Sequence, residues 1–92
     1  MLTLNIIPLP NHEVVGRIID NEAVLVLPGK GEVKVLNEVG GRIWSLIDGQ
    51  RSIKGIASDI CREFKVSQSD AEGDTLIFLQ QLWDKEIITI EP

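Results

Sequence analysis

Residues 32–49 read EVKVLNEVGGRIWSLIDG, and the spacing of the apolar residues changes within this stretch. Apolar and polar residues alternate over residues 32–36, a pattern typical of a strand with one buried face. Asn37 follows and is suited to cap a helix. The next apolar residues recur at helical spacing, at Val39, Ile43, Leu46 and Ile47. The stretch therefore predicts a short strand that leads directly into a helix.

Two more strands are predicted before this stretch. Residues 13–19 are rich in valine and isoleucine, and residues 23–27 are apolar on both faces. Residues 20–22 are polar and residues 28–31 contain proline and glycine, so both segments are suited to tight turns. Three short strands joined by tight turns predict an antiparallel meander, in which residues 32–36 form an open edge.

Helical spacing continues through most of the second half of the chain. Ser52 and Ser67 are expected to cap a second and a third helix. Residues 87–90 predict a short closing strand, whereas residues 1–12 contain two prolines and predict an irregular arm. We expect an α+β fold in a single domain, with a three-stranded antiparallel sheet followed by three helices. This arrangement is similar to winged helix-turn-helix folds.

The composition is that of a small folded domain. The chain has 92 residues, of which 43% are hydrophobic and 25% charged, a balance that excludes a disordered chain. The longest apolar run covers residues 23–27, far short of a membrane span. No basic segment precedes an apolar stretch at the start, so no secretory signal is expected. Cys61 is the one cysteine, which excludes an internal disulfide, and we expect a cytoplasmic protein.

Catalysis requires an acid, base or nucleophile with a partner in reach, and no such group stands out. His12, the one histidine, lies in the proline-containing arm and is expected to be solvated. Cys61 lies on the apolar face of the second helix, where it is expected to act as a small hydrophobic residue. The glycines that flank Lys30 do not have the spacing of a phosphate-binding loop. The acidic residues of the third helix do not share one face. We expect no enzyme, no cofactor and no metal site.

The winged-helix arrangement raises the alternative of a DNA-binding accessory protein. In such folds the last helix usually enters the groove of DNA, where lysine and arginine contact phosphates. From Asp70 to the end the chain has six acidic residues and one lysine, which accounts for the whole net charge of −5. A mild basic patch is expected around the second helix, at Arg51, Lys54, Arg62 and Lys65. These charges argue against nucleic acid as a partner.

Two features are not explained by a simple core. The glycine pair at residues 40–41 lies in the first helix, where each glycine costs about 1 kcal/mol relative to alanine. It indicates either a close approach of another segment or an irregular first turn. Ile77 points roughly opposite the apolar face of the third helix, while Phe78 lies along one margin with Asp74 and Gln81. Such a margin is more often the edge of the core, but an open strand edge beside it favours a peptide groove.

A succession of short motifs carries a resemblance to a known family: Leu36-Asn37, Ile43-Trp44 and Asp48-Gly49-Gln50-Arg51-Ser52-Ile53. Further matching residues surround it, namely residues 23–28, Gly40, Leu46, Ile56-Ala57, Phe64, Asp74, Phe78-Leu79 and Leu82. Over about residues 12–90 the chain resembles the PqqD family. The fold of this family is also the precursor-peptide recognition element of pathways for ribosomally synthesised, post-translationally modified peptides.

The resemblance implies a non-catalytic peptide chaperone. Members of the family hold the leader segment of a precursor peptide as an added strand beside the third strand, in a groove closed by the third helix. They deliver it to a modifying enzyme, often a radical S-adenosylmethionine protein. In the namesake pathway the product is pyrroloquinoline quinone, and the N-terminal arm of this chain departs from the proteins of that pathway. Carried onto this chain, the expected peptide-binding residues are Glu32, Val33, Lys34, Val35, Leu36, Asp74, Ile77, Phe78 and Gln81.

Other partners follow from the residues themselves. An uncovered strand edge also allows two copies of the chain to pair, which would give a homodimer. A structural subunit that docks on an enzyme through Trp44 and the first helix is a third class of function, beside peptide binding and DNA binding. No membrane is an expected partner.

Overall fold

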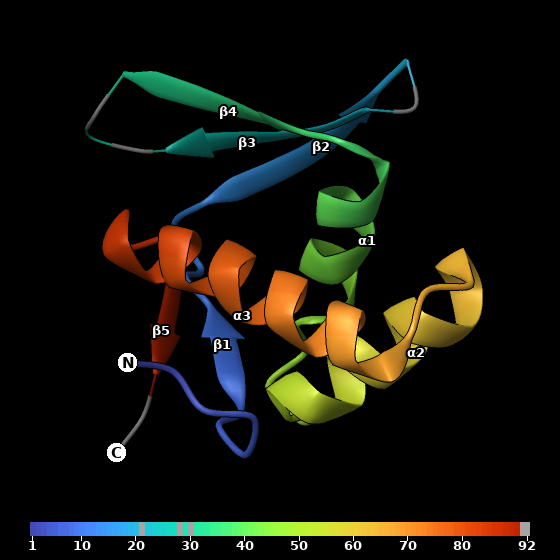
Figure 1. Cartoon of the computed structure of the whole chain (residues 1–92). Helices are drawn as coiled ribbons and strands as arrows, with labels where there is room; N and C mark the ends of the chain where they lie inside the picture. The colour runs from blue at the N-terminus through green and yellow to red at the C-terminus, as the bar shows by residue number, and fades with distance from the viewer. Residues whose placement is uncertain (21, 28, 30, 91–92) are drawn as a thin grey trace.

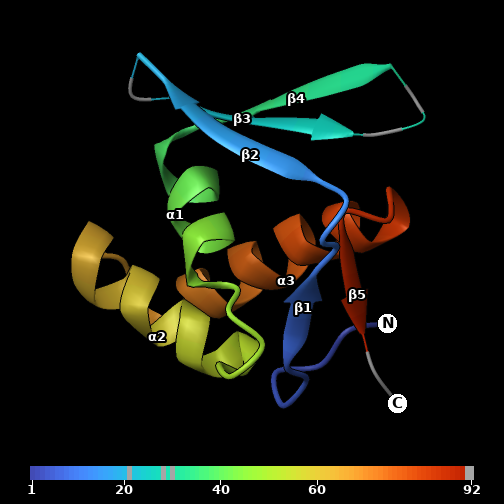
Figure 2. The ribbon, with the colours of Figure 1, turned by 180° about the vertical axis from the view of Figure 1, so that it is seen from behind.

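The structure, a computed structural model, describes residues 1–20, 22–27, 29 and 31–90 (Figure 1). The elements in chain order are β1 (Pro8–Pro10), β2 (Val15–Ile19), β3 (Glu22–Leu27), β4 (Glu32–Leu36), α1 (Glu38–Leu46), α2 (Ile53–Phe64), α3 (Gln68–Asp84) and β5 (Ile88–Ile90). Strands β2 to β4 form one sheet above the helices, and β1 and β5 form a separate pair (Figures 1 and 2). This arrangement confirms the predicted fold class.

The three-stranded sheet is an antiparallel meander in the order β2-β3-β4. Leu25 of β3 lies opposite Lys34 of β4, which sets their register. Because alternate side chains of a strand point to opposite faces, one face of β3 is buried against the helices. The buried residues of that face are Ala23, Leu25 and Leu27. The predicted strand over residues 32–36 is confirmed with its bounds, but Val33 and Val35 are exposed, and Leu36 is the buried residue of β4.

Each helix begins at a predicted cap. The side chains of Asn37, Ser52 and Ser67 each accept a hydrogen bond from the backbone N–H three residues later, at 2.7, 3.1 and 3.1 Å. A cap of this kind stabilises a helix by about 1 kcal/mol, because the first turn otherwise has free N–H donors. After α1, Gly49 has a φ of 77°, in the left-handed region that glycine adopts without strain.

The expected irregular arm over residues 1–12 is wrong in part. Pro8–Pro10 form β1, which pairs antiparallel with β5. The N–H of Asn11 donates to the carbonyl of Ile87 at 3.0 Å. Since hydrogen-bonded positions alternate along an antiparallel strand, Leu9 and Asn11 occupy the donor positions and the two prolines fall between them. A central strand is excluded by the prolines, but an edge strand tolerates them.

The residues before β1 complete the beginning of α2. The carbonyls of Leu4 and Ile6 accept hydrogen bonds from the N–H groups of Lys54 and Ile53, both at 2.9 Å. These donors belong to the first turn of α2 and have no acceptor within the helix. Leu2 is buried as well. The N-terminal segment is therefore an ordered part of the fold.

Strand boundaries differ slightly from the prediction. β2 begins two residues later and β5 one residue later, whereas β3 begins one residue earlier. Before β2, the N–H of Val14 donates to the carbonyl of Asn11 at 3.0 Å, so the chain turns there. The predicted turn residues Asn21, Pro28 and Lys30 lie outside the described residues.

The core lies between the sheet and the three helices. Its centre is formed by residues without exposed surface, among them Leu25, Ile53, Ile56, Leu79 and Leu82. These residues come from β3, α2 and α3, so burial of their side chains ties the two layers together. None of the helices in the described ranges is long and apolar enough to cross a membrane.

Thr75 provides a test of this core. Its side chain is fully buried on α3, and its Oγ1 has no hydrogen-bond partner among the described residues. A buried hydroxyl without a partner costs about 1–3 kcal/mol, whereas valine has the same shape and no polar atom. Thr75→Val is therefore expected to raise the free energy of unfolding by about 1 kcal/mol, measured by urea denaturation. Thr75→Ser, which keeps the hydroxyl and loses the methyl, is the control and should lower it. A less stable Thr75→Val protein would contradict the prediction.

Candidate functional site

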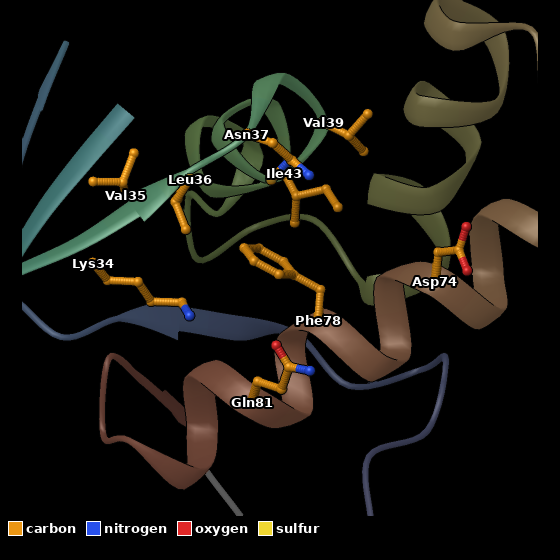
Figure 3. Close-up of a pocket in the computed structure, with 10 residues that line it drawn as sticks. Lys34, Val35, Leu36, Asn37, Val39, Ile43, Asp74, Phe78 and Gln81 are labelled. Carbon is orange, nitrogen blue, oxygen red and sulfur yellow. The ribbon is translucent and has the colours of Figure 1, made fainter. Parts of the chain in front are cut away.

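A groove lies between β4 and α3, with the start of α1 at its floor (Figure 3). Its volume is about 480 Å³. The residues that line it are Lys34, Val35, Leu36, Asn37, Val39, Gly40, Ile43, Asp74, Phe78 and Gln81. Figure 3 shows apolar side chains in the middle, with Lys34 and Gln81 at one end and Asp74 at the other. The groove is therefore apolar at its centre and polar at both ends.

The glycine pair brings α1 close to two neighbours. A Cβ on Gly40 would lie 3.2 Å from a ring carbon of Phe78 and 3.2 Å from the Oδ1 of Asn37. A Cβ on Gly41 would lie 3.0 Å from the Cβ of Ala23 in the sheet. The two carbon–carbon distances, to Phe78 and to Ala23, are shorter than an ordinary contact. Of the two interpretations of the pair, close approach is correct, and α1 is regular over this turn.

The wall formed by β4 has a free edge. β4 pairs with β3 on one side, and no other strand among the described residues pairs with it. The C-terminal strand β5 pairs with β1 instead (Figures 1 and 2). An edge strand presents unpaired N–H and C=O groups, which are a template for a further strand. The groove therefore places an open backbone edge beside an apolar pocket.

The structure brings most of the predicted binding residues to this groove, namely Lys34, Val35, Leu36, Asp74, Phe78 and Gln81. Glu32 is the first residue of β4 and does not line the groove; its carboxylate lies 3.8 Å from the Nζ of Lys85. Val33 is exposed on β4 and does not line the groove. Ile77 is exposed and lines a separate depression that includes Met1. The side chains of these three residues do not line the groove, so their roles stay predictions, although the backbone of Val33 belongs to the free edge strand.

The remaining lining residues come from α1 and the residue before it, and sequence reasoning did not assign them to the site. Asn37 is interpreted from the sequence as a cap, and Val39 and Ile43 as core residues. Among these residues, Gly40 alone gives a sequence signal of a special role, because a glycine inside a helix indicates that another segment approaches closely. The sequence does not say that the approaching group is Phe78. That contact depends on how α1 and α3 cross.

The arginines around α2 are paired with carboxylates. Arg42 donates two hydrogen bonds to Glu63, at 2.8 and 3.0 Å. Hydrogen bonding to Arg42 lowers the pKa of the Glu63 carboxyl, and the same contact raises the pKa of Arg42. Arg51 and Arg62 both contact Asp59. Because binding to DNA depends on free cations that contact phosphates, this pairing weakens the DNA-binding alternative.

Neither His12 nor Cys61, the two residues considered for catalysis, lines the groove. His12 is exposed in the turn between β1 and β2. Cys61 is half-buried, and its Sγ donates to the carbonyl of Val66 at 3.0 Å. Within the described ranges, no group of three or more side chains is arranged to hold a metal ion.

Comparison with protein families identifies the chain. The family described as Coenzyme PQQ synthesis protein D (PqqD) matches residues 22–88. The chain belongs to the PqqD family. The matched residues include β3, β4 and all three helices, and therefore the whole lining of the groove. A search of curated proteins finds no match.

Three solved structures share the fold. TbiB1 in complex with the TbiA(beta) leader peptide is 35% identical, with 87% of this chain and 93% of that chain covered and a TM-score of 0.79. A lasso peptide synthetase B1 complexed with the leader peptide is 22% identical, with 90% and 98% covered and a TM-score of 0.81. The PqqD truncation of Methylobacterium extorquens PqqCD, described as a functional and stand-alone recognition element, is 23% identical, with 89% and 87% covered and a TM-score of 0.75.

Asn37 links the free strand to the groove floor, and its cap can be tested. Asn37→Ala removes the acceptor of the Gly40 N–H and is expected to lower the free energy of unfolding by about 1 kcal/mol. Asn37→Asp keeps an acceptor at the cap and should stay within about 0.5 kcal/mol of the native protein. Urea denaturation measures both. Equal losses in the two variants would show that the side-chain acceptor does not stabilise α1.

Proposed function

We propose that this PqqD-family chain is a non-catalytic peptide chaperone. It binds the leader segment of a ribosomally made precursor peptide as a strand added to the free edge of β4, and it presents that peptide to a modifying enzyme. Its place of action is the cytoplasm, where such precursors are synthesised. The observation that carries the proposal is the open edge of β4 beside the apolar groove under α3.

The similar structures support this use of the groove. TbiB1, at 35% identity, is described in complex with a leader peptide, and the same is said of the lasso peptide synthetase B1. Strand addition at a sheet edge is a common way to bind an extended peptide, because the main chain supplies hydrogen bonds and pockets select side chains. In this chain the pocket is formed mainly by Leu36, Ile43 and Phe78.

The groove offers enough free energy for a transient complex. Four backbone hydrogen bonds contribute roughly 2–6 kcal/mol in total. Two apolar side chains buried in the groove add about 1.5–3 kcal/mol each. Ordering a flexible peptide and restricting its motion offset much of this gain. A dissociation constant of about 1 μM, near −8 kcal/mol, is therefore expected. Such a complex releases the peptide readily to an enzyme.

One prediction of the proposed function concerns the backbone edge. Val35→Pro removes an N–H donor that we expect to face the free edge of β4. Affinity for a leader peptide should fall about tenfold, because about 1.4 kcal/mol of hydrogen bonding is lost. Isothermal titration measures the affinity, and circular dichroism checks the fold.

Ile18→Pro is the matched control, because it places proline in β2, at the other edge of the same sheet. It should leave affinity unchanged. An unchanged affinity in Val35→Pro, or equal losses in both variants, would argue against strand addition at β4.

Another prediction of the proposed function concerns the pocket. Phe78 is half-buried at the centre of the groove, so Phe78→Ala should weaken peptide binding more than tenfold with a modest loss of stability. Leu79, the next residue, is fully buried in the core. Leu79→Ala is therefore the control, with a stability loss of about 2–5 kcal/mol. If Phe78→Ala destabilises the protein as much as Leu79→Ala while the folded fraction still binds peptide, Phe78 is a core residue and not a binding residue.

A further inference from the structure

Two opposite charges lie at the two ends of the groove. Figure 3 shows the amine of Lys34 beside Gln81 at one end and the carboxylate of Asp74 at the other, with the ring of Phe78 between them. Both residues line the groove. Neither forms an ion pair with another described residue, whereas Arg42, Arg51 and Arg62 all do. Lys34 and Asp74 are therefore open to charges on an incoming peptide.

The spacing of these groups matches that of an extended peptide. Asp74 and Phe78 are one helical turn apart, about 6 Å along α3. Inward-pointing side chains of a strand repeat every second residue, about 6.7 Å. The step from Phe78 to Gln81, next to the amine of Lys34, is about 4.5 Å along the helix. Three alternate residues of a peptide strand can therefore contact the Asp74 carboxylate, the Phe78 ring and the Lys34 amine in turn. The long charged side chains cover the difference between the two spacings.

The direction of the added strand sets the order of the charges. Every strand pair of this sheet is antiparallel, and antiparallel pairs are the more common and the more stable kind. β4 runs from the Lys34 end of the groove toward the Asp74 end (Figure 3). A peptide antiparallel to β4 enters at Asp74 and leaves past Lys34.

We propose that the groove selects peptides with a basic, an apolar and an acidic residue at alternate positions, in that order. The basic side chain lies against Asp74, the apolar one against Phe78, and the acidic one against Lys34. This proposal rests on the proposed function, since it assumes strand addition at β4. Backbone hydrogen bonds are nearly independent of sequence, so the end charges add selectivity that the apolar pocket lacks.

The test uses the whole chain and an unbiased display library of random peptides. Selection on the native protein is expected to enrich the alternate pattern of base, apolar residue and acid. Two synthetic peptides then carry the enriched sequence and the same sequence with its basic and acidic residues exchanged. The first should bind about tenfold more tightly at low salt, because two weak attractions become two repulsions. The difference should nearly disappear at 1 M salt, where the screening length is about 3 Å.

The double variant K34E/D74K reverses the charges of the groove and should prefer the exchanged peptide. K54E/E13K makes the same changes of charge at exposed positions away from the groove, and should keep the native preference. Circular dichroism confirms that both variants fold. The proposal is overturned if binders are enriched without the charge pattern, if the native protein prefers acid before base, or if K34E/D74K keeps the native preference. Failure to enrich any peptide would instead contradict the proposed function itself.

Discussion

β4 has a hydrogen-bonding partner on one side only, and its open side lies beside α3. This arrangement requires that the C-terminal strand pairs elsewhere. β5 pairs with β1, with Pro8 opposite Ile90, so the N-terminal and C-terminal strands pair with each other. The prolines of β1 have no N–H with which to extend this small sheet on their other side. The free edge of β4 is thus kept available by strands that lie outside the three-stranded sheet.

The groove beside that edge depends on how closely the helices approach one another. Gly40 allows the ring of Phe78 to lie over α1, and Gly41 allows α1 to lie against Ala23 of the sheet. Glycine in a helix interior costs about 1 kcal/mol relative to alanine. The two glycines therefore lower the intrinsic stability of α1, while they allow it to pack closely on two sides. Its cap at Asn37 offsets part of that cost. The same few residues therefore end the free strand, begin the helix and form the floor of the pocket.

Local patterns predicted most of the fold, and long-range contacts account for what was missed. The strand over residues 32–36 and the caps at Ser52 and Ser67 depend on neighbours in sequence, and the structure confirms them. β1 was missed because its partner lies about eighty residues away and prolines argue against a strand. Phe78 and Ile77 are adjacent, but successive helical residues diverge by about 100°, so only Phe78 reaches the groove. The contact between Gly40 and Phe78 depends on how two helices cross, which no local pattern encodes.

Amide hydrogen exchange of the native chain, followed residue by residue with and without a saturating leader peptide, tests the central claim most directly. Strand addition predicts new protection at the amides of Val33 and Val35, which we expect to face the free edge of β4, with little change along β2, the other edge of the sheet. Protection confined to β2 or α2, with β4 unchanged, would contradict it. Exchange reports on the backbone donors themselves, which are the groups that the account requires to become bonded.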